Sequence, residues 1–117
     1  MANPNIVNVS DIRGKTYFNE LITSYATIVN NAAGSNDVYK INVVSVSNAT
    51  GSNRDVSIAV YRSAVYYDIA QSVAVPNNST LVVTSKDTSF YLEEGDQLRA
   101  KSNSSGVEIM VSYEIIS

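Results

Sequence analysis

The sequence predicts an all-β domain, an antiparallel β-sandwich of eight or nine strands, from three features of the chain. Segments rich in Val, Ile, Thr and Tyr recur from residue 21 onward, each about five to ten residues long. Clusters of Asn, Ser, Gly and Pro separate these segments. Apolar residues almost never repeat at the spacing of a helix. Two sheets stacked face to face would bury the apolar sides of these strands. The strands of such a sandwich could be connected as a jelly roll. A small closed barrel is the alternative.

The expected strands follow one another along the chain, and each ends where a turn cluster begins. In order they are residues 21–29, 38–47, 55–61, 66–75, 81–84, 88–92, 98–101 and 107–116, with residues 5–9 as a further short strand. The last is the clearest, because Ile109, Val111 and Ile115 alternate with polar residues, as expected of a strand with one buried face. Pro76 ends the segment before it, since proline cannot donate a hydrogen bond to a ladder.

Residues 1–20 differ from the sandwich domain expected at residues 21–117, because their apolar residues follow no regular period. One interpretation is an extended arm that packs four of its side chains on a neighbouring molecule. These side chains are Ile6, Val9, Tyr17 and Phe18. The other interpretation, which we prefer, is a first edge strand and a loop across the same domain, since strands near a chain start are usually tied into their own sheet.

The composition restricts the partners that the protein can take. The 117 residues fit one domain, and only 16% are charged, with Asn, Ser and Thr in place of the missing charges. A net charge of −3 with scattered Lys and Arg argues against nucleic acid as a partner. No signal peptide or membrane span is recognisable, so we expect synthesis in a cytosol and no membrane partner.

Catalysis is not expected from these residues. The chain has no His and no Cys, which removes the Ser–His–Asp and Cys–His arrangements. Glu93 and Glu94 are the only adjacent carboxylates, and beside Gly95 they indicate a solvated turn. Asp87 and Asp96 add oxygen ligands that suit Ca²⁺, but the spacing matches no EF-hand loop. We therefore expect no enzyme, no metal site and no cofactor, with a calcium ion at a loop end left open.

Tyrosine is the more informative residue, because eight of the ten aromatic residues are Tyr. Tyr61, Tyr66 and Tyr67 lie close together across an expected turn. They could form a contact patch for a protein or, less favoured without Trp, a sugar, because tyrosine combines apolar area with a hydroxyl group. They could equally be cross-strand packing with hydroxyls at the sheet edge.

Six stretches of the chain carry a resemblance to a known family, namely residues 38–42, 46–48, 55–60, 75–83, 90–100 and 107–114. The most specific piece is residues 92–98, a strand that ends in a Gly-Asp turn before a new strand. Through these stretches, residues 36–117 resemble the small β-sandwich virion proteins of tailed bacteriophages, including cyanophages. The resemblance implies a structural role in the particle, and it carries no catalytic residue onto this chain.

These observations together predict a non-enzymatic virion structural protein. We expect a capsid decoration, or cement, protein that binds the outer head surface and stabilises it, with the capsid surface preferred over the tail. The expected partners are the major capsid protein or other virion proteins, with homo-oligomers as a further option. The alternative is a tail, neck or fibre component that binds a receptor or glycan.

Overall fold

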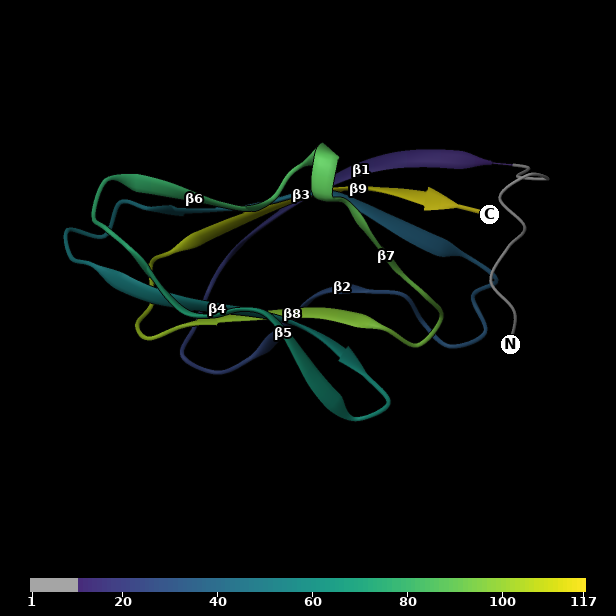
Figure 1. Ribbon diagram of the computed structural model, residues 1–117, viewed down its shortest axis with the longest axis horizontal. Coiled ribbons are helices and arrows are strands. Elements are labelled where there is room, and N and C mark those ends of the chain that lie inside the picture. The colour runs from purple at the N-terminus through teal and green to yellow at the C-terminus, as the bar shows by residue number, and fades with distance from the viewer. Residues whose placement is uncertain (1–10) are drawn as a thin grey trace.

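The computed structural model describes residues 11–117, which form two antiparallel sheets stacked face to face (Figure 1). The strands are β1 (Ile12–Glu20), β2 (Ala26–Asn30), β3 (Val38–Asn48), β4 (Arg54–Arg62), β5 (Val65–Val75), β6 (Ser79–Thr84), β7 (Phe90–Leu92), β8 (Gln97–Ser102) and β9 (Glu108–Ile116). A short 3-10 helix, η2 (Lys86–Thr88), lies between β6 and β7. The expected all-β sandwich is confirmed, with nine strands in the described part of the chain.

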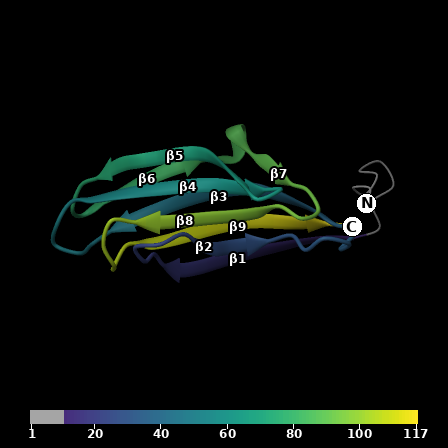
Figure 2. The ribbon, with the colours of Figure 1, turned by 90° about the horizontal axis from the view of Figure 1, so that it is seen from below.

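The topology is that of a long hairpin rolled into two layers. β4 pairs with β5, β3 with β6, β2 with β8 and β1 with β9, all antiparallel. Rolling this hairpin gives two sheets (Figure 2). Sheet A has the strand order β1-β9-β3-β6, and β7 also pairs with β3. Sheet B has the strand order β2-β8-β4-β5. Eight strands wound in this way form a jelly roll, and β7 is a ninth, short strand.

The core lies between the sheets and follows the alternation of the strands. Ile109 and Val111 of β9 belong to one buried cluster with Ile58 of β4 and Leu98 of β8, and Ile115 of β9 is also buried. Each such side chain stabilises the fold by about 1.5–3 kcal/mol when it is fully buried. The buried positions expected for β9 are therefore confirmed, and Val56, Ile58 and Val60 of β4 face the same core.

Two elements differ from the sequence-based expectation. Residues 12–20 form the regular strand β1, although their apolar residues have no period, because cross-strand pairing with β9 along the whole strand fixes them. The strand expected at residues 21–29 begins only at Ala26. The five residues between β1 and β2 cross from sheet A to sheet B, with Leu21 buried at the start of the crossing.

Two buried asparagines hold the loops at opposite ends of the sandwich. The Nδ2 atom of Asn31 donates to the carbonyl oxygens of Asp37 and Leu92 at 2.9 and 3.0 Å. The Nδ2 atom of Asn48 donates to the carbonyl oxygens of Ser52 and Val75, both at 2.8 Å. These amides pair backbone groups that the loops would otherwise leave without partners.

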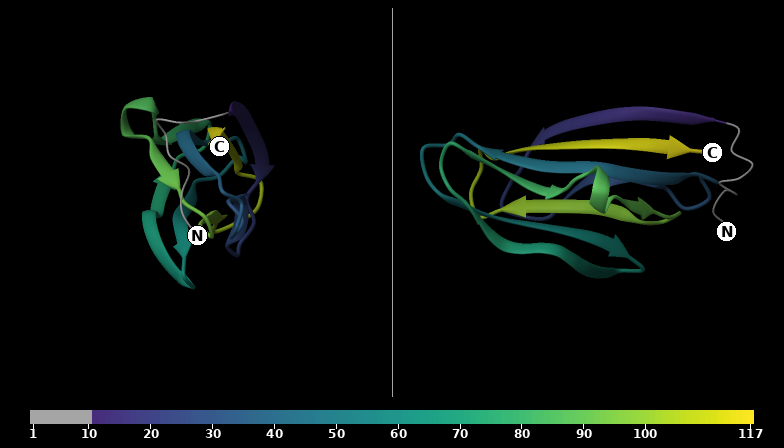
Figure 3. Two further views of the ribbon diagram at one scale, coloured as in Figure 1. Left: turned by 90° about the vertical axis from the view of Figure 1, so that its right-hand side faces the viewer. Right: turned by 45° about the horizontal axis from the view of Figure 1, so that its top comes forward.

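β1 begins beside the C-terminal end of β9, at one end of sheet A (Figure 3). The backbone N–H of Asp11 donates to the carbonyl of Ser117 at 3.1 Å, and the N–H of Ser117 donates back at 3.0 Å. In the described part of the chain, no helix is long and apolar enough to cross a membrane.

Candidate functional site

Several large hydrophobic side chains are exposed in residues 11–117, and most of them lie on three surfaces of the sandwich. The exposed side chains are Ile12, Phe18, Ile22, Val65, Tyr66, Tyr67, Ile69, Val82 and Tyr91. Four of these nine belong to β5, an edge strand of sheet B. Exposed apolar residues scattered singly need no explanation, whereas grouped ones mark contact surfaces.

The first surface, here the outer row, crosses the outer face of sheet A. Phe18 of β1 is opposite Met110 of β9, Met110 is opposite Ser45 of β3, and Ser45 is opposite Val82 of β6. Cross-strand partners share a face, so the row runs over four neighbouring strands. Phe18 is 69% exposed and Val82 58% exposed, and a hollow of about 250 Å³ lies beside Phe18 and Met110. The four residues of the row are uncharged, Glu108 lines the hollow beside them, and the row offers a partly apolar strip to a flat partner.

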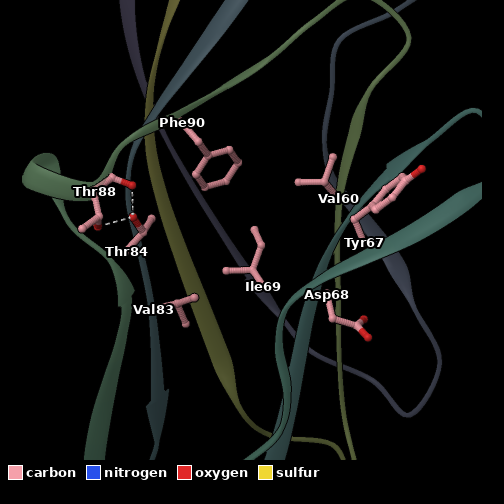
Figure 4. Close-up of a pocket in the computed structure, with 8 residues that line it drawn as sticks. All are labelled: Val60, Tyr67, Asp68, Ile69, Val83, Thr84, Thr88 and Phe90. Carbon is pink, nitrogen blue, oxygen red and sulfur yellow. Dashed lines mark hydrogen bonds between the residues drawn. The ribbon is translucent and has the colours of Figure 1, made fainter.

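The second surface, here the flank groove, lies where β5 diverges from β6 and β7 (Figure 4). Its volume is about 480 Å³, and its lining is Val60, Tyr67, Asp68, Ile69, Val83, Thr84, Thr88 and Phe90. Ile69 points from β5 toward Phe90 and Val83, whereas Asp68 points the other way. The core is thus open along this side of the jelly roll.

An ion-pair network fixes one end of the flank groove. Arg62, at the tip of the β4–β5 hairpin, lies in a further hollow with Val60, Tyr67 and Tyr91. Its guanidinium donates through Nε to Oδ1 of Asp96 at 2.7 Å, and it also pairs with Glu93 at 3.0 Å. Hydrogen bonds to Asp96 raise the pKa of Arg62, so the cation persists at every working pH. The network ties the hairpin to the β7–β8 turn across the two sheets.

The third surface, here the aromatic ladder, covers the outer face of sheet B. The rings of Tyr25 and Tyr66 stack with centroids 4.6 Å apart, and Tyr66 meets Tyr61 at 4.7 Å. The guanidinium of Arg99 lies 3.8 Å from the centroid of Tyr61, and Lys101 Nζ lies 4.8 Å from that of Tyr25. Burial raises the pKa of Tyr25, and the charge of nearby Asp68 adds to the shift. Tyr25 is therefore uncharged at neutral pH.

The structure places the predicted contact residues on different surfaces. Tyr61 and Tyr66 are cross-strand partners in the aromatic ladder, while Tyr67 lines the flank groove on the opposite side of β5. Phe18 belongs to the outer row, and Tyr17 packs against the core from the inner face of β1. Ile6 and Val9 lie outside the described residues.

The sequence indicated a solvated turn at Glu93 and Glu94 beside Gly95, and in the structure the nearby Asp96 is buried. Asp96 is only 1% exposed. Its carboxylate accepts hydrogen bonds from the guanidinium of Arg62 and, at 2.8 Å, from the backbone N–H of Glu93. Glu94 accepts a hydrogen bond from the N–H of Asn36 at 3.1 Å. Gly95 makes the turn possible, since its φ of 88° is costly for other residues. Across residues 11–117, no three acidic side chains gather as a metal site would require.

Sequence reasoning missed most of the residues that form these surfaces. Ile69, Val83 and Phe90 come from three strands, and only the topology brings them together. Arg99 was not singled out, although its position two residues before Lys101 on one strand places both cations on the same face.

The fold is similar to two crystal structures of a pentameric capsid protein isolated from metagenomic phage sequences, one of them solved by iodide SAD phasing. Both have 20% sequence identity and a TM-score of 0.45, and both matches cover 84% of this chain. The chain spans 60% and 58% of the length of those two structures. No protein-family model matches the sequence, and no curated protein is significantly similar to it.

Proposed function

We propose that this chain is a non-enzymatic virion structural protein that decorates the outer surface of a phage capsid and stabilises it. The observation that carries the proposal is the outer row, a strip that crosses four strands and ends in the exposed side chains of Phe18 and Val82. The proposed partner is the major capsid protein or another virion protein.

The sequence supports a role in contact. Residues 36–117 resemble small sandwich proteins of tailed-phage virions, as described above. The chain contains neither His nor Cys, and Asp96 and Glu93 of the acidic turn are engaged with Arg62. The jelly roll is also a fold of viral capsid and lectin domains, which is an analogy at the level of fold alone.

The energetics of decoration fit a neutral, partly apolar strip. Aromatic side chains that become buried in an interface contribute much of its binding energy, and Phe18 is the largest exposed side chain of the outer row. A protein that binds the assembled shell and not its separated subunits stabilises the shell by mass action. Many such copies at modest affinity would raise the temperature at which the shell breaks down.

Sedimentation with capsids tests this function. The full chain is mixed with DNA-emptied capsids of the phage that encodes it, and bound protein and shell disruption temperature are measured. We expect saturable binding at or below micromolar concentration and a higher disruption temperature. Absence of binding at micromolar concentration would contradict the proposal.

Charge substitutions localise the contact. Phe18→Asp places a charge in the outer row and should weaken capsid binding at least tenfold. Gln71→Asp, at an exposed position of β5, is the matched control and should bind as the unchanged protein does. Equal binding by both variants would show that the outer row is not the contact surface.

A second candidate function, a receptor-binding or glycan-binding module of a tail, neck or fibre, is favoured by the aromatic ladder. Tyr66 is 41% exposed, and its hydroxyl accepts a hydrogen bond from Arg99 at 2.7 Å. Stacked rings beside a cation can receive a sugar face and an acidic group. Glycan-array signals that Tyr66→Ser abolishes, without capsid binding, would favour this function over decoration.

A further inference from the structure

We propose that a polar hollow beside the aromatic ladder binds one ring of a neutral sugar. The hollow has a volume of about 160 Å³, and every residue that lines it is polar or charged. Its lining includes Asp55, Ser57, Ser72, Lys101, Ser102 and Asn103. The inference rests on the second function proposed above, glycan binding, to which it gives a site and a ligand class. It is independent of capsid decoration, which uses sheet A.

The register of sheet B brings two opposite charges to the polar hollow. Ser57 of β4 lies between Val56 and Ile58, which belong to the core, so its side chain points to the outer face. Lys101 of β8 is the cross-strand partner of Ser57, and Asp55 is two residues from Ser57 on the same face. Lys101 and Asp55 are therefore diagonal neighbours, with Cα atoms about 7–8 Å apart. An ammonium group and a carboxylate thus border the hollow from two strands.

These two charges are not paired with each other. Within residues 11–117, no ion pair joins Lys101 to a carboxylate, and its Nζ atom lies 4.8 Å from the ring centroid of Tyr25. A molecule between the two groups could accept a hydrogen bond from Lys101 and donate one to Asp55. A hydroxyl group both donates and accepts, and a sugar ring carries several hydroxyl groups.

The lining disfavours the other classes of small ligand. A free anion would be repelled by Asp55 and a metal cation by Lys101, and no three acidic side chains gather in the described part of the chain. An apolar molecule would take water from the polar groups and return no hydrogen bonds. The volume equals that of about five water molecules and is below the roughly 300–1,000 Å³ of a drug-sized ligand site. It therefore suits the hydroxyl-bearing edge of one sugar ring.

The backbone of β5 is shaped around the polar hollow. Gln71 and Ser72 lie opposite Ser57 alone, which makes a bulge in the β4–β5 pairing. Ser72 has a φ of 48°, in the left-handed region that is costly for residues other than glycine. Its N–H donates to the Oγ atom of Ser57, a side chain that is 3% exposed, at 2.9 Å. Bulges and strained residues are concentrated beside binding sites, so this geometry supports a ligand here.

Tyr25 gives the polar hollow an aromatic border. Lys101 lines the hollow and lies over the ring of Tyr25, which in turn stacks on Tyr66. The C–H groups of a sugar ring are apolar and pack on aromatic side chains, whereas its hydroxyl groups need polar partners. The hydroxyl-bearing edge would then enter the hollow while the C–H groups lie along Tyr25.

A titration that follows the backbone amide NMR signals of the full-length protein tests the proposal. The probes are the methyl glycosides of glucose, galactose, mannose and N-acetylglucosamine, with sodium sulfate as the anion control. We expect at least one glycoside to shift the signals of Ser57, Ser72 and Asn103, and sulfate to shift none of them. The dissociation constant should be about 1 mM, because a ring of about twelve non-hydrogen atoms binds weakly.

Two substitutions in the polar hollow show whether its charged groups hold the sugar. Lys101→Met and Asp55→Asn should each weaken binding at least about tenfold, because each removes a charged hydrogen-bonding group and keeps a side chain of similar size. Lys15→Met, at an exposed position of β1 in sheet A, is the matched control and should bind as the unchanged protein does. Binding of equal strength by all three variants would overturn the proposal.

Three titration results would also overturn it. One is the absence of shifts with every glycoside at a concentration tenfold above the expected dissociation constant. Another is a shift with sulfate alone, which would indicate an anion site. The third is a set of shifts confined to Tyr61 and Arg99, which would keep glycan binding but place it on the aromatic ladder instead of the hollow.

Capsid sedimentation separates this inference from decoration. Lys101→Met should bind capsids as the unchanged protein does, because the outer row lies on the other sheet. Loss of capsid binding in Lys101→Met would contradict the separation of the two sites. Capsid binding by an unchanged protein that binds no glycoside would refute the sugar site and leave decoration standing.

Discussion

Asn48 offers the sharpest test of how the loops of this sandwich are held. Its side chain is 1% exposed, donates to the carbonyls of Ser52 and Val75, and accepts from the N–H and hydroxyl of Thr50 at 3.1 and 2.8 Å. Asn48→Ala removes all four hydrogen bonds. Asn48→Asp keeps the shape and both acceptor contacts but replaces the two donor bonds with a charge.

The expected cost follows from the two carbonyls that lose their donor. The carbonyl of Val75 belongs to a residue that is 1% exposed, so leaving it unpaired costs about 1–3 kcal/mol. Ser52 is exposed, and its carbonyl also accepts from the hydroxyl of Thr50 at 3.0 Å, so the loss there is at most about 1 kcal/mol. The free energy of unfolding should therefore fall by about 1–4 kcal/mol in Asn48→Ala, a large part of the 5–15 kcal/mol typical of a domain.

The aspartate variant adds a pH dependence of predictable sign. A carboxylate that is buried against two carbonyls has its pKa raised in the folded state. A raised pKa means that stability is present at low pH and is lost as pH rises through the folded-state value. Asn48→Asp should accordingly lose at least as much stability as Asn48→Ala at pH 8, and less at pH 4.

Urea unfolding at the two pH values measures these differences, with the unchanged protein as reference at each pH. Asn30→Asp, at an exposed position of β2, is the matched control and should change stability by less than about 0.5 kcal/mol. An Asn48→Asp variant as stable as Asn30→Asp at pH 8 would refute this reasoning.

Three further predictions follow from the core, the ion-pair network and the buried tyrosines. Leu98→Ala should lower the free energy of unfolding by about 2–5 kcal/mol, because the leucine is fully buried in the core. Arg62→Met should lower the free energy of unfolding by about 1–3 kcal/mol, because the Asp96 carboxylate loses its cation. The loss stays in this range because Arg62 is half exposed and solvent screens its charge. Burial raises the pKa of Tyr39 and Tyr113 in the folded state, so stability should fall as pH rises above about 10, where the unfolded tyrosines ionise first.

Chemical denaturation checks all three. Val82→Ala, at a position 58% exposed, is the control for Leu98→Ala and should stay within about 0.5 kcal/mol of the unchanged protein. Lys40→Met, outside the ion-pair network, serves the same purpose for Arg62→Met. Replacing Tyr39 and Tyr113 with Phe should flatten the alkaline decline. A decline of the same slope in that double variant would contradict the assignment to these residues.

The sequence supported the fold class well, because local alternation reports burial directly. Residues 107–116 show which side chains point inward, and β9 follows them. The strand β1 was harder to recognise, since its residues are exposed on almost every position and only pairing with β9 makes them regular. The late start of β2 was equally hidden, because a crossing between sheets leaves no periodic signal.

The candidate surfaces were less predictable than the strands. Tyr61 and Tyr66 lie opposite each other because the hairpin turn is short, and their proximity in sequence indicated this. The bond between Arg62 and Asp96 joins residues 34 positions apart, and no local pattern reports such a pairing. The flank groove likewise depends on how far β5 diverges from β6, which is a property of the packed sheets.

The most direct test of a decorating role is a cryo-EM reconstruction of the virion that carries this protein. The account predicts density for the sandwich at repeated positions on the outer capsid surface, with the face of sheet A that bears Phe18 and Val82 toward the shell. Density for the sandwich confined to the tail or its fibres would contradict it.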